Sequence, residues 1–183
     1  NGGVAPILKH IPGHGRAEVD SHLALPKINS EMSPLKKRDF KTFFSLNDCK
    51  AAMTGHLLFS QIDPINPVTT SSIIINELIR EHIKFQGLLL SDDLSMEALS
   101  GSLSQRASKA LSAGCDIGLH CNGRLDEMAE IASTKLQFNK DSETRRDTFL
   151  SQIKRLKKNR KNINYESTLH KFNEKLTSTC ADH

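Results

Sequence analysis

Four short apolar runs, each ending in polar or ionisable residues, constrain the fold of this chain more than any other feature of its sequence. The segments between them carry apolar residues at helical spacing, so strands and helices are expected to alternate. Such strands are joined by crossover connections and lie parallel in one sheet, which predicts the α/β class. The expected strands are VAPILKH (4–10), AAMTGHLLF (51–59), GLLLSDD (87–93) and CDIGLHC (115–121).

Cap residues mark two of the expected helices. Residues 71–85 begin with serine and carry an early Glu, and we expect Gly87 to stop this helix. Residues 103–114 end in the same way at a glycine. Weaker helical patterns cover the segments 33–47, 125–138 and 142–158.

Ionisable residues gather at the carboxyl ends of the expected strands. These ends share one edge of a parallel sheet, the edge at which α/β barrels and open α/β sheets bind their ligands. The long loop 11–35 and the proline-bearing loop 60–68 leave the same edge, and long ordered loops are typical of lids and binding loops. We therefore expect the functional site there. The residues concerned are Lys9, His10, His56, Asp92, Asp93 and His120.

Composition and charge exclude several classes of protein. The 183 residues contain no apolar run of membrane-spanning length, and no leader pattern opens the chain, so we expect a cytoplasmic protein without a membrane partner. The net charge of +4 is concentrated in KRLKKNRKN (154–162), which has six cations and no acid. We interpret this run as a solvated helical face and expect no nucleic-acid partner, with nonspecific anion or RNA binding as the alternative.

Neither a metal nor a cofactor is expected. The four cysteines match no zinc or disulfide spacing, so we expect them to be reduced. His10 and His14 have the spacing of a helical zinc site, but Pro12 and Gly13 between them are incompatible with a helix. The cysteines are Cys49, Cys115, Cys121 and Cys180.

Asp92 and Asp93 lie where an apolar strand leaves the core. Adjacent residues of an extended chain point to opposite sides, so only one of the two can face a ligand. The other is expected to cap the following helix or to bond to a neighbouring loop. An ordinary acidic turn at a strand end is the simpler alternative.

A second group of candidate residues precedes and occupies the long loop. Asp20 and His22 project the same way in an extended loop, and the carboxylate fixes the tautomer of the imidazole and raises its basicity, which makes His22 a candidate proton shuttle. Lys9 and His10 can donate hydrogen bonds to ligand hydroxyls. Together with a partly desolvated aspartate, this set is typical of retaining glycoside hydrolysis, with a histidine in place of the second carboxylate.

Three ordered motifs resemble those of the bacterial β-N-acetylglucosaminidases of glycoside hydrolase family 3, from about residue 3 to residue 140. The resemblance implies a TIM (β/α)8 barrel, of which this chain would cover roughly strands 5–8 plus C-terminal helices. Residues 1–141 would then form the C-terminal half of the catalytic barrel, and residues 142–183 a helical extension with the basic run. The motifs are KHIPGHGRAEVDSH (9–22), MTGHLLFSQIDP (53–64) and SDDLSMEAL (91–99).

The same resemblance implies roles for individual residues. Asp92 would be the nucleophile that forms a covalent glycosyl-enzyme intermediate, His22 the general acid/base, and Asp20 its dyad partner. Asp93 would be structural. The substrate-binding residues would be Lys9, His10, Met53 and His56.

The implied function is that of a retaining exo-β-N-acetylhexosaminidase, which removes terminal β-linked N-acetylglucosamine from peptidoglycan-derived muropeptides during cell-wall recycling. One alternative is a phosphorylase that uses the same site with phosphate instead of water. The other is an inactive truncated remnant or binding module, because the first four strands of the family's barrel are absent. A missing N-terminal half-barrel is accordingly an expected partner, beside the carbohydrate substrate.

Overall fold

The computed structural model describes residues 3–134, 136, 138–158 and 164–179. The chain separates into a main unit, Pro6–Leu150, and a smaller unit made of the described residues before Pro6 and after Leu150. The smaller unit contains the end of α5 (Lys140–Lys158) and α6 (Tyr165–Thr179); α6 lies within the expected helical extension, although no separate helix was expected there. Among the described residues, no helix is both long and apolar enough to cross a membrane. Part of the basic run, residues 159–162, and Cys180 lie outside the described residues.

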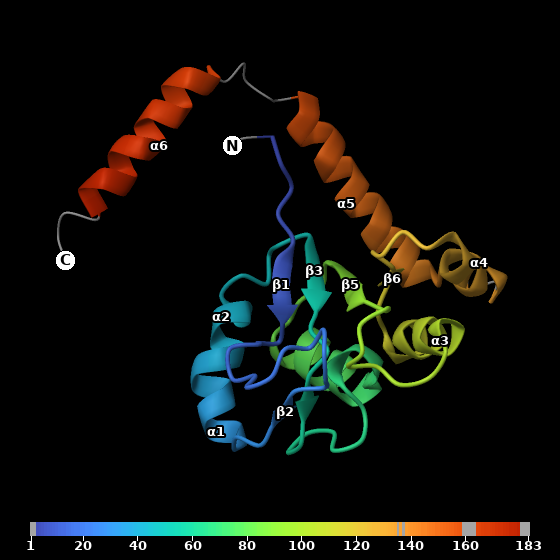
Figure 1. The fold of residues 1–183 in the computed structure, drawn as a ribbon. Coiled ribbons are helices and arrows are strands. Elements are labelled where there is room, and N and C mark those ends of the chain that lie inside the picture. Colours follow the sequence, from blue (N-terminus) through green and yellow to red (C-terminus); the bar gives the residue numbers. More distant parts are fainter. Residues whose placement is uncertain (1–2, 135, 137, 159–163, 180–183) are drawn as a thin grey trace. The chain divides into compact units, whose positions relative to one another are not determined.

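A four-stranded parallel sheet forms the centre of the main unit (Figure 1), with its strands in chain order. Consecutive strands that lie side by side are the normal result of successive right-handed βα units. The expected α/β class with a parallel sheet is therefore confirmed. The sheet of the described residues is open, with its first and last strands at the edges. The strands are β1 (Leu8–Ile11), β3 (Ala51–Thr54), β5 (Leu88–Asp93) and β6 (Ile117–Leu119).

A second, two-stranded parallel sheet was not expected. It pairs β2 (Lys27–Ile28), from the long loop, with β4 (Leu58–Phe59). The expected strand 51–59 is thus two strands, because the chain turns after β3 and the N–H of Leu57 bonds to the carbonyl of Gly55 at 3.0 Å. Two-residue strands carry no periodicity that a sequence could reveal. The pairing of β2 with β4 holds the C-terminal part of the long loop in place.

Helical segments follow the strands at the expected places. The side chain of Ser71 accepts the N–H of Ile74 at 3.1 Å, as expected for the start of the second helical region. Ser102 and Gln105 form a capping box at the start of α3, and Gly114 ends it in the left-handed conformation with φ 117°. The helical segments of the main unit are α1 (Met32–Pro34), η1 (Leu35–Asp39), α2 (Phe40–Phe44), η2 (Val68–Thr70), η3 (Ile74–His82), α3 (Leu103–Ala113) and α4 (Leu125–Ser133).

The prediction that Gly87 stops a helix was wrong. The helix η3 ends at His82, and Lys84 takes up the left-handed conformation with φ 62°. A Cβ on Gly87 would lie 2.7 Å from the carbonyl oxygen of Cys49 and 2.7 Å from Cζ of Phe85. Gly87 is therefore needed for a close approach at the start of β5, rather than for a helix end.

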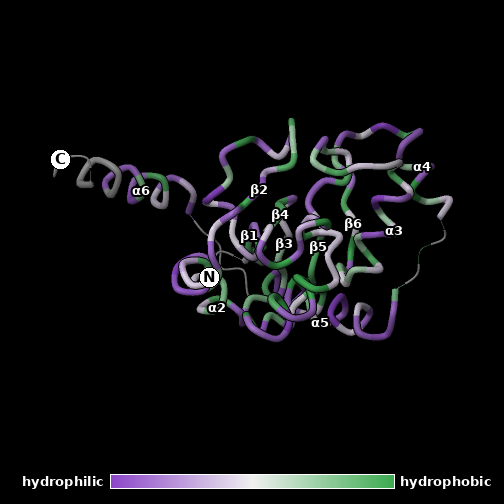
Figure 2. Tube along the Cα trace, turned by 90° about the horizontal axis from the view of Figure 1, so that it is seen from below, coloured by the Kyte–Doolittle hydropathy of each residue, from purple (hydrophilic) through white to green (hydrophobic). Residues whose placement is uncertain are grey.

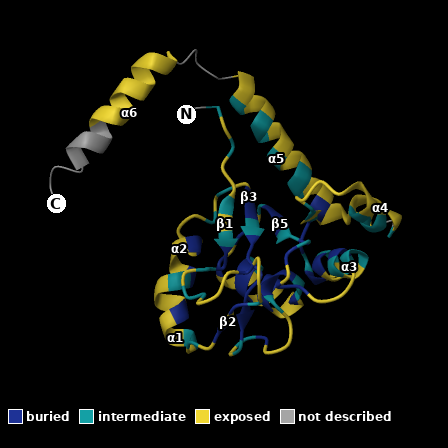
Figure 3. Cartoon of the chain, viewed as in Figure 1, coloured by how far each residue is buried: buried dark blue, intermediate teal, exposed yellow. Residues whose placement is uncertain are grey.

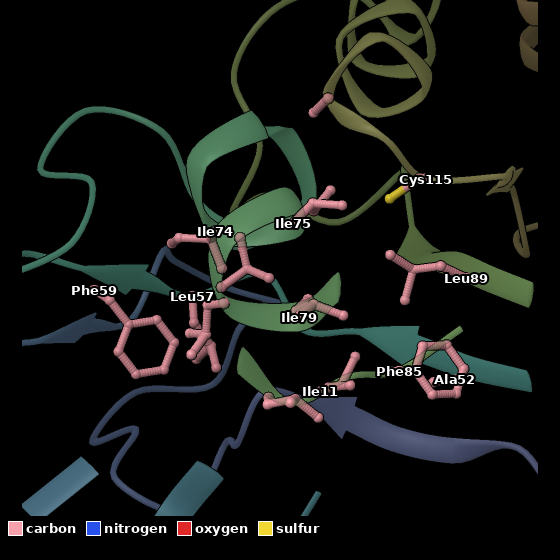
Figure 4. Close-up of a cluster of buried hydrophobic side chains, with 14 of the residues drawn as sticks. Ile11, Ala52, Leu57, Phe59, Ile74, Ile75, Ile79, Phe85, Leu89 and Cys115 are labelled. Atoms are coloured by element: carbon pink, nitrogen blue, oxygen red, sulfur yellow. The ribbon is translucent and has the colours of Figure 1, made fainter. Parts of the chain in front are cut away.

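The main core lies between one face of the sheet and the helices (Figure 4), where Ile11, Ala52 and Leu89 of the strands meet side chains of η3. Figure 3 shows buried residues (dark blue) on the central strands, and Figure 2 shows hydrophobic residues (green) along the same strands. A smaller apolar cluster belongs to the other face of the sheet. It comprises Ala51, Leu88 and Leu90, with Ile117, Leu119 and Phe149 packed against them.

Asp116 ties the sheet to two helices. Its Oδ2 accepts hydrogen bonds from the N–H of Leu89 at 2.8 Å and from Nη2 of Arg80 at 3.0 Å. Its Oδ1 accepts from Oγ of Ser142 at 2.6 Å and from Nη1 of Arg145 at 3.0 Å. The side chain is 1% exposed. A buried carboxylate with four donors is well satisfied, which makes this residue a structural centre of the unit.

Candidate functional site

The carboxyl ends of β1 and β5 bring His10 and Asp92 together. Nε2 of His10 lies 3.6 Å from Oδ2 of Asp92, whose side chain is 16% exposed. The other carboxylate oxygen, Oδ1, accepts the N–H of Asp93 at 2.9 Å. One oxygen of Asp92 is thus held by the backbone, while the other faces an imidazole at a partly open position.

His10 is held in its neutral form by its surroundings. Burial lowers its pKa, and this effect outweighs the raising effect of Asp92. The ring also lies beside that of His14, with 5.5 Å between their centroids. A neutral imidazole at this place can act as a hydrogen-bond donor or acceptor without a permanent charge.

Gly55 makes room for both histidines. It follows β3, the strand between β1 and β5. A Cβ at this position would lie 3.1 Å from Cβ of His10 and 3.2 Å from Cδ2 of His14. The site therefore depends on a residue without a side chain.

Gly55→Ala is expected to displace the two histidine rings by a few tenths of an ångström and to reduce stability by about 1–3 kcal/mol. The measurement is urea unfolding, combined with NMR of the His10 ring. Gly15→Ala is the matched control, because a Cβ there meets nothing within 4 Å. Equal effects of both substitutions would contradict the packing argument.

Asp93 is bonded into the fold, as expected for one of the two acids. Its Oδ1 accepts the N–H of Ser95 at 3.0 Å and that of Cys121 at 3.1 Å, and its Oδ2 accepts the Ser95 hydroxyl at 2.7 Å. Burial alone would raise the pKa of Asp93, but these hydrogen bonds outweigh it and hold the pKa below its ordinary value. Asp93 thus joins the end of β5 to the loop after β6.

His56 has an internal role in this structure, which differs from the expected contact with substrate. The residue is 0% exposed. Its Nε2 lies 2.9 Å from the carbonyl oxygen of Asp93, to which it donates, and its Nδ1 accepts from Oγ1 of Thr69 at 2.7 Å. Burial lowers the pKa of His56, in agreement with a neutral ring. Because both nitrogens are used within the fold, His56 supports the strand end beside Asp92 instead of facing a ligand.

Lys9 and Met53 lie at the same level of neighbouring strands, since their Cα atoms are paired in the β1–β3 register. The Lys9 side chain is exposed and that of Met53 is half-buried. Both residues thus stand at the edge that carries His10. His120, by contrast, turns toward α4, where its Nε2 lies 2.7 Å from Oε2 of Glu127.

The long loop presents Asp20 and His22 as a hydrogen-bonded pair. Nδ1 of His22 lies 2.7 Å from Oδ1 of Asp20, and the two side chains are 73% and 59% exposed. The carboxylate can only accept, so Nδ1 carries the proton and Nε2 is left to exchange protons with a ligand. The hydrogen bond to Asp20 raises the pKa of His22. In the described residues, no hydrogen bond or ion pair joins His22 to Asp92.

Asp20→Asn is expected to lower the pKa of His22 toward the ordinary value of histidine, because the acceptor charge is removed. His22 would then lose its proton at a lower pH than in the native chain. An NMR titration of the His22 Cε1 proton measures the change. Glu18→Gln removes a nearby charge without touching the pair, and it should leave the titration unchanged. An unaltered titration in Asp20→Asn would mean that the pair does not form in solution.

Comparison with known proteins identifies the family. The sequence pattern of the Glycosyl hydrolase family 3 N terminal domain matches residues 1–156. The chain belongs to glycoside hydrolase family 3. The expected resemblance is thereby confirmed.

Named members of family 3 are similar to this chain over most of its length. A beta-hexosaminidase of Pseudomonas aeruginosa is 40% identical over 138 residues, which are 74% of this chain and 41% of that protein. The corresponding protein of Idiomarina loihiensis is 39% identical over 125 residues, covering 67% and 38%. The chain therefore spans about two fifths of the length of these relatives.

Solved structures of family 3 enzymes share its fold. NagZ from Neisseria gonorrhoeae, in complex with N-trifluoroacetyl-D-glucosamine, gives a TM-score of 0.66 at 36% identity and covers 75% of this chain and 40% of its own. Zinc-bound CbsA from Thermotoga neapolitana gives 0.71 at 29% identity, covering 82% and 37%. In the described part of the present chain, no group of three or more His, Cys, Asp or Glu residues is placed to hold a metal ion.

Some contacts of this family 3 site were missed by sequence reasoning. His14 packs on His10, and its Nε2 lies 3.5 Å from Oγ of the buried Ser21 in the long loop. Thr69 reaches His56 from η2. The sequence analysis considered His14 only as a metal ligand beside His10, and nothing in the local sequence marks Thr69, because its partner lies 13 residues away.

Proposed function

We propose that this chain carries the nucleophile and the acid/base of a retaining exo-β-N-acetylhexosaminidase. The observation that carries the proposal is the pair His10–Asp92 at the strand ends, 3.6 Å apart, with an Asp–His dyad on the adjoining loop. Relatives named beta-hexosaminidases and a NagZ structure with an N-acylglucosamine ligand support the substrate class. Terminal β-linked N-acetylglucosamine of peptidoglycan-derived muropeptides is the proposed substrate, and cytoplasmic cell-wall recycling the proposed setting.

In the first step, the carboxylate of Asp92 attacks the anomeric carbon and the bond to the leaving oxygen breaks. Protonated His22 gives its Nε2 proton to that oxygen, and Asp20 stabilises the imidazolium until the transfer occurs. A raised pKa suits this role, because it increases the fraction of His22 that carries the proton at a given pH. Neutral His10 and the Lys9 ammonium hold the sugar hydroxyls, and Met53 forms part of the pocket wall.

In the second step, neutral His22 accepts a proton from water, whose oxygen attacks the anomeric carbon and releases Asp92. Because no hydrogen bond or ion pair joins the exposed dyad to Asp92 in the described residues, we propose that the loop moves toward Asp92 when substrate binds. In this scheme His56 and Asp93 position the end of β5 through the hydrogen bonds described above.

We further propose that residues 1–141 provide the fifth to eighth strands of a (β/α)8 barrel, and that residues 142–183 form a helical extension. An open sheet with two edge strands, and a second apolar cluster on the face of the sheet opposite the main core, support this arrangement. An N-terminal half-barrel would complete it. If catalysis requires the N-terminal half-barrel, the isolated chain binds the sugar without hydrolysing the glycoside.

Labelling with a fluorinated N-acetylglucosaminyl fluoride tests the proposal. The expected result is a glycosyl ester on the peptide that contains Asp92, identified by mass spectrometry after proteolysis. A label on any other residue would overturn the assignment of the nucleophile. Absence of label from both the chain and its complex with an N-terminal half-barrel would overturn the catalytic function.

His22→Ala is expected to slow the hydrolysis of glycosides with poor leaving groups more than that of activated aryl glycosides. Proton donation matters less when the leaving oxygen is already a stable anion, so the two losses should differ by about 10²-fold or more. The measurement is kcat/KM for a series of N-acetylglucosaminides. Equal losses across the series would remove His22 from the acid role.

A further inference from the structure

A hollow of about 610 Å³ opens beside the proposed sugar site. Its wall is formed by the end of β1, the turn that follows it and the side of η1 and α2. His10 belongs to this wall and also lies 3.6 Å from Asp92. The hollow therefore begins one side chain away from the proposed nucleophile, and Lys9 and His10 are the two lining residues to which a role is assigned above.

The charge of this wall is predominantly positive. Lys9, Arg16 and Arg38 contribute cations, and Asp39 is the one carboxylate among the lining residues. Asp39 is already engaged, because Nε of Arg16 lies 3.1 Å from its Oδ1 and 3.0 Å from its Oδ2. In the part of the chain that the structure describes, the side chains of Lys9 and Arg38 have no hydrogen-bond or ion-pair partner. Two cations are thus left uncompensated around a concave surface.

Such a wall is suited to an oxyanion. Guanidinium groups bind carboxylates and phosphates through charge-assisted hydrogen bonds, and the Arg16–Asp39 pair orients one of them in advance. The imidazoles of His10 and His14 add further hydrogen-bonding groups. A neutral sugar would leave this excess of positive charge unused.

We propose that the cationic hollow, defined by Lys9, Arg16 and Arg38, binds a carboxylate or phosphate group next to the sugar. This inference rests on the proposed function only for the identity of the neighbouring sugar. The anion has two possible sources, a carboxylate carried by the sugar substrate or free inorganic phosphate. Binding measurements separate them.

Calorimetric titrations of the full chain at low ionic strength test the proposal with three probes. N-Acetylmuramic acid and N-acetylglucosamine differ by one lactyl ether with its carboxylate, and inorganic phosphate carries the anion alone. A carboxylate source predicts about tenfold tighter binding of N-acetylmuramic acid than of N-acetylglucosamine. A phosphate source predicts phosphate binding together with equal affinities for the two sugars.

Arg38→Gln is the decisive variant, because Arg38 is exposed and its side chain holds no other part of the described structure. It should abolish the preference for N-acetylmuramic acid over N-acetylglucosamine, or the binding of phosphate, while the melting temperature stays unchanged. Lys36→Gln removes the same charge from the same helical segment outside the hollow, and it should preserve both.

Three results decide the outcome. Loss of anion binding in Arg38→Gln but not in Lys36→Gln supports the cationic hollow. Equal losses in the two variants, or no anion binding to the native chain, overturn it, and retained binding of N-acetylglucosamine would then leave the proposed function intact. Phosphate binding that depends on Arg38, without any binding of N-acetylglucosamine, supports the hollow and counts against the proposed function.

Discussion

Asp116→Ala is expected to lower the free energy of unfolding by about 3–5 kcal/mol, which is the usual cost of breaking a buried ion pair from one side. The substitution leaves Nη2 of Arg80 without its carboxylate acceptor, in a site where burial already lowers the pKa of the guanidinium. It also leaves the N–H of Leu89 unpaired at the start of β5, and releases Ser142 and Arg145 of α5. Urea unfolding followed by circular dichroism measures the loss.

Asp126→Ala is the matched control for this experiment. Asp126 also pairs with an arginine, Arg124, at 2.8 Å, but the two side chains are largely exposed. Exposed pairs contribute little to stability, so this variant should unfold almost as the native chain does. Similar losses in the two variants would show that burial and the number of donors do not set the importance of Asp116.

Asp92→Asn is expected to reduce glycoside turnover by about 10⁴-fold or more, as is usual when a nucleophile is removed, while the chain stays folded. The amide can still occupy the same space beside His10 and can still accept the N–H of Asp93. It cannot form the glycosyl ester. The loss of turnover is measured with an aryl N-acetylglucosaminide and the complex of this chain with an N-terminal half-barrel. The loss of the glycosyl ester is measured by labelling with the fluorinated sugar.

Asp93→Asn provides the complementary outcome. Its carboxylate accepts three hydrogen bonds that join Ser95 and Cys121 to the end of β5, so this variant should melt at a lower temperature and still accept the label at Asp92. Loss of labelling in Asp93→Asn with an unchanged melting temperature would exchange the roles of the two acids.

The regular part of the fold was accessible from the sequence because its signals are local. The strand ending in Asp92 and Asp93 reads as an apolar run, and α3 carries a capping serine and a terminal glycine that act within one turn. Gly87 was misread for the opposite reason. Its contacts with Cys49 and Phe85 depend on the packed structure, and no local pattern distinguishes this glycine from a helix stop.

The same distinction applies to the site. Asp20 and His22 are two residues apart, so their pairing followed from spacing alone. The enclosure of His56 did not, because it depends on Thr69 and on the carbonyl of Asp93, which is 37 residues away. A histidine near a strand end looks the same in sequence whether it faces a ligand or braces the backbone.

The small sheet formed by β2 and β4 sets the working radius of the proposed acid/base. The carbonyl of Pro26 accepts the N–H of Leu58 at 2.9 Å, which fixes the chain four positions beyond His22. Four extended residues reach roughly 14 Å, so the backbone of His22 stays within about that distance of the anchor at Pro26. Insertions between His22 and Pro26 would lengthen this connection without altering the hydrogen bond at Pro26. The imidazole could then move farther, and it would be placed less precisely at the glycosidic oxygen.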